Sequence, residues 1–595
     1  MLGNHTATEE APAGRERDEG RATVAFCALA AVVCILASGL SFAEFLRSRF
    51  DHVAGNFGDA RLAIYLQEHW YNVYHGREAW LSPPFFYPVK HLLAYSDTYF
   101  LQSLPYSLLR LAGLDPYVSF EGTLLLFSWV GYGFTVGLLR QLGVRRGFAI
   151  LGATLFVFSN LFHIWVLAPQ SYTIMLVPLA LLGVAKAAAY GPRYRTRTLL
   201  LLSAAGITCS LILFSAFYTG WCLGFFGLLV GALAIATHRE LRSRCIALVK
   251  DHRSLILPAL VAASLALVPF FITYGPAILA SQGRSYEEVL RLALPLADIV
   301  NVHTGNLVWG HLLGRIDPDY SNLALAYGLP PGLLCGFLLV IALMLARRRA
   351  LPWERSDIRF VLVSRSAVAV LLAWALLFKA GNVLLWQMVW QWVPGGSAIR
   401  VTPRFQYQLS LAVVVVVVAA LSAAWDAAPR HAAAGRPLRR GMVQISLGIA
   451  SMFLLLEQVN LVQTHQVSRS AEQADLAIPA PPLRCQSFFI QQAAVPLIPG
   501  IALQIDAMLI SQRMAVPTIN GYSGFNPPGW ELGNPSAPDY LDKVQSWASS
   551  HQLRQPCAFQ IHGIWSAEPL TRWRPAGEGL KSQSSRPSST IGQLR

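Results

Sequence analysis

Charged residues are scarce in this sequence. Asp, Glu, Lys and Arg together make up 13% of its 595 residues, whereas a soluble domain carries roughly a quarter. A surface with so little charge does not mostly face water. The hydrophobic share of 54% and the mean hydropathy of +0.44 indicate the same. We therefore exclude an ordinary soluble protein and predict a polytopic membrane protein with one appended domain.

Motifs of soluble enzymes are also lacking. The sequence has no Walker loop, no Gly-x-Gly-x-x-Gly after a strand and no Gly-x-Ser-x-Gly elbow. No spacing of Cys and His is typical of a zinc site. The net charge of +15 does not indicate a nucleic-acid partner, because the arginines stand in short clusters between apolar runs.

Long apolar runs are what the sequence does contain. A membrane span needs about 20 mainly apolar residues, and eleven such runs occur, at residues 22–46, 116–139, 147–166, 170–189, 198–217, 220–237, 255–274, 323–346, 360–378, 404–424 and 441–463. The first run follows several arginines, as in a signal peptide. Its apolar stretch from Ala22 to Leu40 exceeds the roughly 7–15 residues of a signal, so we interpret it as an uncleaved anchor. Residues 217–220 are expected to form a tight hairpin between two spans.

Arginine is confined to alternate loops. Six arginine-rich segments, counting the N-terminal tail, lie on one side of the membrane if the chain crosses it eleven times. By the positive-inside rule this side is the cytoplasm. We therefore expect a multi-pass protein of the bacterial inner (plasma) membrane. Its parts are a cytoplasmic tail at 1–21, a transmembrane domain at 22–463 with a long external loop at 47–115, a periplasmic or extracellular α/β domain at 464–578 and a disordered tail at 579–595.

Two of the eight cysteines, Cys485 and Cys557, lie in this C-terminal domain. An oxidising compartment favours a disulfide between two such residues. The alternative is a pair of separately buried thiols. Because the arginine pattern places the domain outside the cytoplasm, we predict the disulfide.

Four short motifs carry the candidate chemistry. In chain order they are Gly55-Asn56-Phe57-Gly58-Asp59 with Glu68-His69-Trp70, then Pro84-Phe85-Phe86-Tyr87-Pro88 with Tyr95-Ser96-Asp97, then Ile399-Arg400-Val401-Thr402-Pro403-Arg404, and Asn520-Gly521-Tyr522-Ser523-Gly524. With these motifs the chain resembles the C-type (GT-C) membrane glycosyltransferases. Among them it is similar to bacterial YfhO-like and other uncharacterised GT-C-like membrane proteins.

The resemblance implies a helical GT-C fold and an activity. Such enzymes transfer a sugar from a polyprenyl-phosphate donor on the external face of the membrane. An acidic residue of their first external loop acts as the base or positions the acceptor. Asp59 matches that residue best, and Asp51 is second. The implied partners are the lipid-linked donor, an envelope glycan, lipid or protein as acceptor, and the surrounding membrane lipids.

Other residues fit supporting roles in such a transfer. A departing phosphate needs positive charge or a metal, and Arg400 and Arg404 match phosphate geometry. Asp97 is a candidate to bind a divalent cation, Mg or Mn, together with Asp59. Further candidates for binding are His69, His163 and His303.

Each candidate has a structural alternative. The aspartates can cap helices, the two arginines can anchor at lipid headgroups, the histidines can be packed and hydrogen-bonded, and residues 520–528 can form a rigid turn. The competing functions are a transporter or flippase of a lipid-linked or envelope component and a non-enzymatic envelope assembly protein. We find no internal repeat and few charges in mid-span, which favours the transferase.

Overall fold

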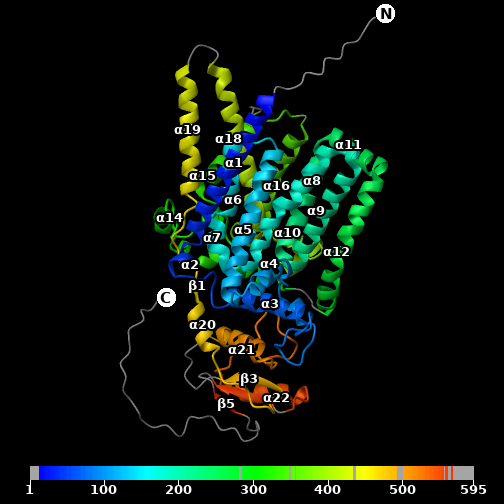
Figure 1. The fold of residues 1–595 in the computed structure, drawn as a ribbon, viewed down its shortest axis with the longest axis vertical. Coiled ribbons are helices and arrows are strands. Elements are labelled where there is room, and N and C mark those ends of the chain that lie inside the picture. Colours follow the sequence, from blue (N-terminus) through cyan, green and yellow to red (C-terminus); the bar gives the residue numbers. More distant parts are fainter. Residues whose placement is uncertain are drawn as a thin grey trace, which may run out of the picture. The chain divides into compact units, whose positions relative to one another are not determined.

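The computed structural model describes residues 13–280, 284–346, 350–355, 357–432, 437–491, 500–554, 556–560 and 564–566. The chain folds into two compact units (Figure 1). Unit 1 comprises the residues up to Tyr74 together with Asp97–Arg469, and unit 2 comprises His75–Ser96 together with the residues from Ser470 onward. The predicted tail at 579–595 and residues 1–12 of the predicted N-terminal tail lie outside the described residues.

Unit 1 is a helical bundle. Its helices are α1 (Ala13–Ser41), α2 (Ala43–Arg47), α3 (Asp59–Tyr74), α4 (Phe100–Leu111), α5 (Pro116–Gln141), α6 (Arg146–Val157), α7 (Asn160–Ile164), α8 (Val177–Tyr190), α9 (Arg195–Ser215), α10 (Phe217–Thr237), α11 (Arg239–Asp251), α12 (Arg253–Ala280), α13 (Tyr286–Leu292), α14 (Gly310–Ile316), α15 (Pro331–Leu345), α16 (Ile358–Leu377), α17 (Trp386–Trp392), α18 (Gln406–Ala432) and α19 (Pro437–Leu456). A short 3-10 turn, Thr402–Phe405, leads into α18. Two short strands, β1 (His52–Val53) and β2 (Val467–Ser468), pair antiparallel within the unit.

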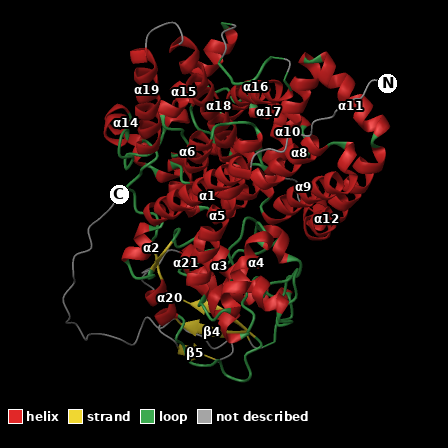
Figure 2. Cartoon of the chain, turned by 45° about the horizontal axis from the view of Figure 1, so that its top comes forward, coloured by secondary structure: helices red, strands yellow, loops and turns green. Residues whose placement is uncertain are grey.

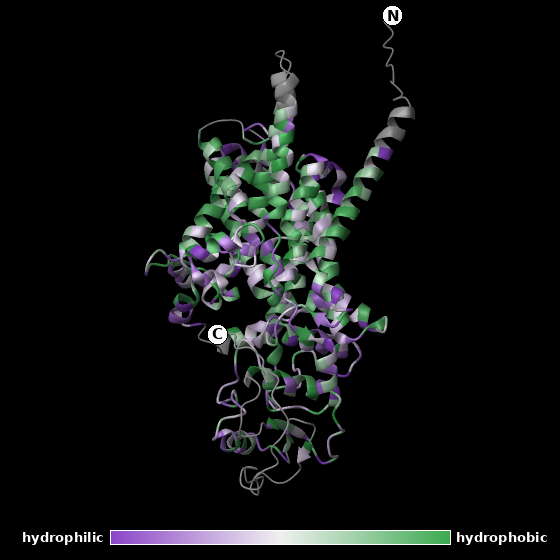
Figure 3. Ribbon diagram, turned by 90° about the vertical axis from the view of Figure 1, so that its left-hand side faces the viewer, coloured by the Kyte–Doolittle hydropathy of each residue, from purple (hydrophilic) through white to green (hydrophobic). Residues whose placement is uncertain are grey.

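Nine helical stretches among the described residues are long and apolar enough to cross a membrane. They are Arg21–Ser41, Pro116–Gln141, Arg146–Leu167, Pro169–Tyr190, Pro192–Ser215, Phe217–Thr237, Arg253–Ile278, Ile358–Leu377 and Thr402–Ala427. Two shorter apolar helices, Pro331–Leu345 and Gly441–Leu456, coincide with the two remaining predicted spans. Figure 3 shows the helices of this bundle as largely hydrophobic. The predicted polytopic helical fold is confirmed.

The turn between the fifth and sixth spans lies slightly earlier than we predicted. Helix α9 ends at Ser215 and α10 begins at Phe217, so the chain turns at Ala216, which has extended backbone angles (φ −145°, ψ 98°). The expected hairpin at residues 217–220 is therefore wrong by a few residues, because one extended residue is enough to interrupt the helical hydrogen bonds. The first N–H groups of α10 are left without partners inside the helix.

Helices that are apolar on every side occupy either the middle of the bundle or its rim. Helix α18 lies in the middle, since 67% of the residues in its most apolar stretch are buried. Its valines Val413, Val414, Val416, Val417 and Val418 are all buried. Helix α12 lies at the rim, since only 17% of the residues in its most apolar stretch are buried. An apolar surface of that kind is stable in lipid and not in water.

Helix α4 has its polar side inside and its apolar side outside. Its buried side chains are Gln102, Ser103, Tyr106 and Ser107. Leu104, Leu108 and Leu111, spaced by four and three residues, are exposed by 43%, 67% and 63%. Such an inversion fits a helix whose outer face meets lipid.

Unit 2 contains helices α20 (Arg469–Asp475, whose first residue still belongs to unit 1), α21 (Gly500–Met514) and α22 (Tyr540–Ser550), with strands β3 (Ser487–Gln491), β4 (Pro556–Gln560) and β5 (Ile564–Ser566). Strand β3 is parallel to β4, and β5 is antiparallel to β4. Figure 2 shows that strands make up little of the described part of the chain. Cys485 and Cys557 form a disulfide with Cα atoms 5.6 Å apart, beside a core that includes Phe488, Leu503 and Phe559.

We expect replacement of both Cys485 and Cys557 by serine to destabilise unit 2 by about 2–5 kcal/mol, because the bridge restricts the unfolded chain. The measurement is the midpoint of denaturant unfolding, followed by limited proteolysis of unit 2. The control is Cys335→Ser, which removes an exposed free thiol of unit 1. Equal midpoints for the double variant and the wild type, or two free thiols in a non-reducing peptide map, would contradict the expectation.

Candidate functional site

Asp59 is the first residue of α3. The N–H groups of Gly58 and Asp59 donate to Oδ1 of Asn56 at 3.0 and 2.9 Å. Asn56 therefore supplies the cap for which the sequence offered Asp59 as a candidate. The Asp59 carboxylate is half-buried and interacts electrostatically with Asp97 and Arg404.

The backbone that precedes Asp59 is held by the chain that leaves α19. Beyond the β1–β2 pairing, the N–H of Gly55 donates to the carbonyl of Thr464 at 2.8 Å, and the N–H of Gln466 donates to the carbonyl of Gly55 at 3.0 Å. Gly55 has a φ of +99°, and a Cβ there would collide with Cβ of Ala60. Only glycine allows this turn into α3.

A buried cluster of charged side chains, Glu44, Glu121 and His465, lies beside the backbone that precedes Asp59. Nε2 of His465 is 3.0 Å from Oε1 of Glu121, and Nδ1 is 3.4 Å from Oε2 of Glu44. Glu121 also accepts the N–H of Ala54 at 2.8 Å. Burial lowers the pKa of His465, but the two carboxylates outweigh it and raise the pKa to about 9. The charged imidazole thus joins α2, α5 and the segment after α19 to the backbone before Asp59.

Asp97 binds the break between α9 and α10. Its Oδ1 accepts the N–H of Phe217 at 2.8 Å, so this carboxylate caps α10 and not the helix that follows it in sequence. Burial raises the pKa of Asp97 to about 6; the Phe217 N–H and Arg404 oppose the rise, and Asp59 adds to it. A carboxyl group with such a pKa can take up and release a proton near neutral pH.

The residues after Asp97 are fixed to the same break. Oγ1 of Thr98 donates to the carbonyl of Phe214 at 2.7 Å, and the N–H of Leu101 donates to Oγ of Ser215 at 2.9 Å. The first N–H groups of α4 are thus capped by the hydroxyls of Ser215 and Thr98, and the N-cap residue Tyr99 makes no side-chain capping bond. The alternative in which Asp97 caps its own helix is therefore not what the structure has.

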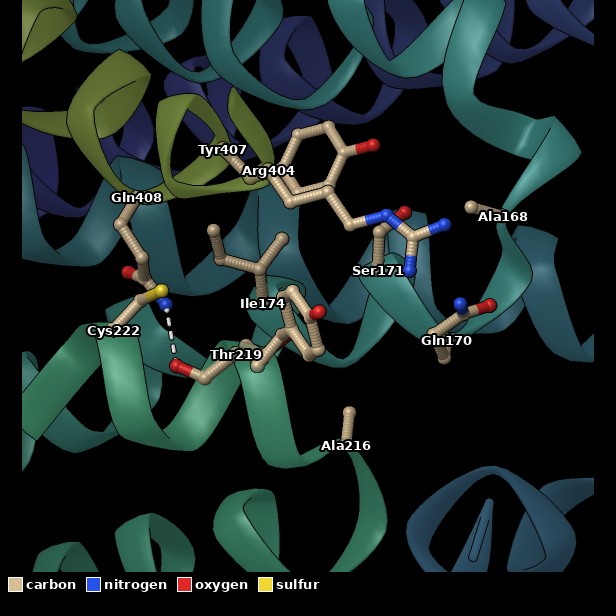
Figure 4. A pocket seen from close by; sticks show the side chains of 11 residues that line it. Ala168, Gln170, Ser171, Ile174, Ala216, Thr219, Cys222, Arg404, Tyr407 and Gln408 are labelled. Atoms are coloured by element: carbon tan, nitrogen blue, oxygen red, sulfur yellow. Dashed lines mark hydrogen bonds between the residues drawn. The ribbon is translucent and has the colours of Figure 1, made fainter. Parts of the chain in front are cut away.

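Arg404 projects into a cavity beside this break (Figure 4). The cavity is small, about 10 Å³, and is lined by Ala168, Gln170, Ser171, Ile174, Ala216, Tyr218, Thr219, Cys222, Arg404, Tyr407 and Gln408. Cζ of Arg404 lies 5.5 Å from the ring centroid of Tyr218, a cation–π distance. Its Nε has no hydrogen-bond partner among the described residues. The same guanidinium is hydrogen-bonded to the side chain of Tyr327.

Arg400 has a different environment. Its guanidinium is paired with Glu288 at 3.1 Å, and its backbone N–H donates to the hydroxyl of Tyr218 at 2.8 Å. Arg284 approaches the same carboxylate at 3.7 Å. Tyr218 thus contacts both predicted arginines, but only Arg404 is directed into the cavity.

The predicted histidines do not line this cavity within the described residues. His69 is fully buried in α3. His163 and His465 line a second cavity, and Nε2 of His163 lies 3.1 Å from the carbonyl of Val462. Nδ1 of His303 accepts the N–H of Gly305 at 2.9 Å, and its Nε2 donates to the carbonyl of Ser321 at 3.0 Å, so both ring nitrogens hold a loop.

Asp51, the second candidate for the acidic role, takes part in the β1–β2 junction. Its Oδ2 accepts the hydroxyl of Ser468 at 3.0 Å, and its carbonyl accepts the N–H of Arg469 at 2.8 Å. These contacts give Asp51 a structural task, whereas Asp59 interacts with Asp97 and Arg404.

Several cavity residues were missed from the sequence. Gln170 and Tyr407 are single polar side chains within predicted spans, and Tyr218 lies in the expected hairpin; such residues are common and carry no motif. The usable signal was a helix break: Tyr218 follows the turn at Ala216, and Gln170 follows Pro169. Polar residues at breaks of spanning helices often line cavities.

The described residues contain no group of three or more His, Cys, Asp and Glu side chains that could hold a metal ion. Asp59 and Asp97 provide two carboxylates. Mg²⁺ is commonly bound by one or two carboxylates, with waters and substrate phosphates completing its shell. The residues present are therefore compatible with a cation that is shared with a phosphate.

Comparison with known proteins found no protein family and no curated protein that matches the sequence. Among solved structures, the oligosaccharyltransferase of Archaeoglobus fulgidus in complex with Zn and sulfate is similar, with a TM-score of 0.51 and 12% identity over 89% of this chain and 67% of that chain. The same enzyme tethered to an acceptor peptide with the NVT sequon gives a TM-score of 0.48, at 12% identity over 89% and 69%. ArnT from Cupriavidus metallidurans bound to undecaprenyl phosphate gives 0.42, at 12% identity over 83% and 85%. At this identity the first likeness shows a shared fold, and it confirms the predicted GT-C fold.

We expect His465→Gln to destabilise the protein by about 3–5 kcal/mol, because it leaves buried carboxylates without their cation. The pKa of His465 is raised to about 9 in the folded protein, against about 6.5 in an unfolded chain. The stabilisation is therefore complete below about pH 6.5 and is lost as the pH rises through about 9. Thermal unfolding in detergent from pH 6 to 10 should show a difference between wild type and variant that shrinks at high pH.

The matched control is His52→Gln, because His52 lies on the adjacent strand and is exposed. It should leave both the midpoint and its pH dependence unchanged. A difference between His465→Gln and wild type that stayed constant from pH 6 to 10 would speak against a charged His465.

Proposed function

We propose that this protein is a membrane glycosyltransferase that moves a sugar from a polyprenyl-phosphate donor to an acceptor outside the cytoplasm, which is an envelope glycan, lipid or protein. The observation that carries the proposal is the electrostatic interaction of Asp59 and Asp97 with each other and with Arg404, which lines the cavity. The fold shared with an oligosaccharyltransferase supports it. The arginine pattern of the loops supports a non-cytoplasmic site.

In the proposed reaction, Asp59 orients the acceptor hydroxyl and takes its proton. The oxygen lone pair forms a bond to the anomeric carbon of the donor sugar. The bond between that carbon and the phosphate oxygen breaks, and its electron pair leaves with the polyprenyl phosphate. Asp97 accepts a hydrogen bond from the Phe217 N–H, and its side chain is the second carboxylate beside the reacting groups.

Arg404 stabilises the charge on the departing phosphate. Its unpartnered Nε and its position in the cavity wall make it better suited to this task than Arg400, which is paired with Glu288. The ring of Tyr218 lies at a cation–π distance from the guanidinium on one side, and the Tyr327 side chain is hydrogen-bonded to it. Preorganised donors of this kind are effective because they need no rearrangement during the reaction.

A divalent cation, Mg or Mn, is compatible with this arrangement of carboxylates and Arg404. Asp59 and Asp97 would hold it, and it would supply positive charge to the donor phosphate. The similar oligosaccharyltransferase structure contains Zn. Loss of transfer on chelation, with recovery on adding Mg or Mn, is the measurement that decides metal dependence.

The central test is an in vitro transfer assay with defined polyprenyl-phosphate sugars. Asp59→Asn should lower kcat by about 100- to 10,000-fold, because the base is lost. Arg404→Gln should lower it by about 100- to 1,000-fold, because one charge-stabilising group is lost. The control is Asp51→Asn, which alters a neighbouring carboxylate at the β1–β2 junction. Full activity in Asp59→Asn, or equal losses in Asp51→Asn, would refute the assignment.

The pH dependence of the rate tests Asp97. Because the pKa of Asp97 is raised to about 6, its carboxylate is charged above pH 6 and protonated below it. We expect the rate of transfer to fall as the pH drops through about 6, and this limb to be absent in Asp97→Asn at its lower rate. A limb at pH 6 that persisted unchanged in Asp97→Asn would assign it to another group.

A further inference from the structure

The short helix α17 (Trp386–Trp392) packs one face against the spanning helix α10 (Figure 2). The fully buried ring of Trp386 lies edge-on to the rings of Trp221 and Phe225 of α10, with centroids 5.8 and 6.3 Å apart. Nε1 of Trp221 also donates to the carbonyl of Pro394, just after α17, at 2.9 Å. Both α17 and the turn that ends it are therefore attached to the same span.

This contact sets the depth of α17 in the bundle. Trp221 and Phe225 stand four and eight positions after Phe217, the first residue of α10. At about 1.5 Å per residue they lie roughly 6 and 12 Å along the helix. The hydrocarbon core of a bilayer is about 30 Å thick, so α17 lies beside the first part of the span and not beyond its end. A face that α17 leaves exposed at this level is next to lipid.

The exposed part of α17 consists of an apolar and a polar face. Leu385, Met388 and Trp392, spaced by three and four residues, are exposed by 46%, 62% and 81%. Leu385 precedes the first helical residue and already has helical backbone angles (φ −69°, ψ −11°), so it continues the apolar face. Gln387 and Gln391 are exposed on another side of the helix. A helix with an apolar and a polar exposed face is typical of the membrane interface, where tryptophan is also enriched.

The chain around α13 holds α17 from a second direction. The hydroxyl of Tyr286 donates to the carbonyl of Leu384 at 3.0 Å, and Nε1 of Trp390 donates to the carbonyl of Arg284 at 3.3 Å. The rings of Tyr286 and Trp390 lie 5.6 Å apart. Because α17 is fixed on two sides, it cannot turn its apolar face toward the protein.

The same contacts reach the Arg404 cavity, within unit 1. The ring of Phe225 also lies edge-on to that of Phe405, the neighbour of Arg404, at 5.9 Å. Beyond α17, the N–H of Arg400 donates to the hydroxyl of Tyr218, whose ring lies against Arg404. Tyr218 is the second residue of α10, so Arg404 lies at the level where the span ends and the lipid headgroups begin.

We propose that α17 is an interfacial anchor that docks on the bilayer, with Leu385, Met388 and Trp392 inserted into the leaflet at the end of the bundle where Asp97 caps α10. Lipid is the occupant of this face, because the face is continuous with the exposed apolar side of α10, where Leu228 is 75% exposed. The anchor holds Arg404 at the depth of the lipid phosphates. The proposal rests on the proposed function for the use of this depth by a lipid-linked donor, but not for the docking itself.

The first test measures the access of water to α17 in a bilayer. Met388→Cys and Gln387→Cys change neighbouring exposed residues on the two faces. Each variant is reconstituted as single copies in phospholipid nanodiscs and treated with a charged, water-soluble maleimide, and peptide mass spectrometry follows the modification. Only the thiolate reacts, and apolar surroundings disfavour it, so we expect Met388→Cys to react at least about tenfold more slowly than Gln387→Cys.

Two results would overturn the docking. Equal rates for Met388→Cys and Gln387→Cys would show that water reaches the apolar face. Protection of Met388→Cys only in nanodiscs that hold two copies would assign the face to a second copy of the chain and not to lipid.

The second test measures what the anchor does for the site. Met388→Glu and Gln387→Glu introduce the same carboxylate on the two faces, with little change in side-chain length. A charge on the apolar face should displace α17 from the leaflet and raise KM for a polyprenyl-phosphate sugar in nanodiscs by about 3- to 10-fold. Gln387→Glu should leave this KM unchanged. With a short-chain, water-soluble donor in detergent, Met388→Glu should match the wild type, because no bilayer then sets the depth of the donor.

The two tests separate the possible failures. Slow modification of Met388→Cys with no transfer activity in the wild type would keep the anchor and refute the proposed function. Transfer by the wild type with an unchanged donor KM in Met388→Glu, or an equal rise in Gln387→Glu, would overturn the role of α17 in donor binding. If Met388→Glu does not fold, Met388→Gln replaces it, since this change makes the face polar without adding a charge.

Discussion

The hydrogen bond from the Phe217 N–H to Asp97 joins the first long loop to a break between two spanning helices. In a membrane an interrupted helix must satisfy its free N–H groups within the protein. Here a carboxylate does so, and it comes from a segment more than a hundred positions earlier in the sequence. The same break places Tyr218 in the wall of the cavity. The contact that caps the interrupted helix therefore lies next to the candidate site.

Arg400 and Arg404 show how neighbouring residues of one motif acquire different tasks. They are four positions apart and equally suited to phosphate by chemistry. Glu288 neutralises Arg400, whereas the ring of Tyr218 holds Arg404 without removing its charge or occupying its Nε. The difference depends on partners that lie far away in sequence, so residue type alone could not reveal it.

The sequence was sufficient for features that depend on composition. The spans followed from apolar length, since lipid imposes a fixed minimum. It was insufficient where long-range contacts decide. The turn at Ala216, the capping of α10 by Asp97 and the inclusion of Pro84–Pro88 in unit 2 each join residues that no local pattern connects. The Asn520 motif was recognised as a turn, but the hydrogen bond that its carbonyl accepts from the N–H of Phe86 was not.

The cluster of Glu44, Glu121 and His465 has a consequence for biosynthesis. Glu44 and His465 are 421 residues apart, so the backbone before Asp59 cannot take its final form until nearly all spans have been made. At about 5–20 residues per second, the ribosome needs roughly 20 to 80 s for that interval. A partly synthesised chain therefore holds no complete site, and a truncated one exposes two unpaired acidic groups to quality control.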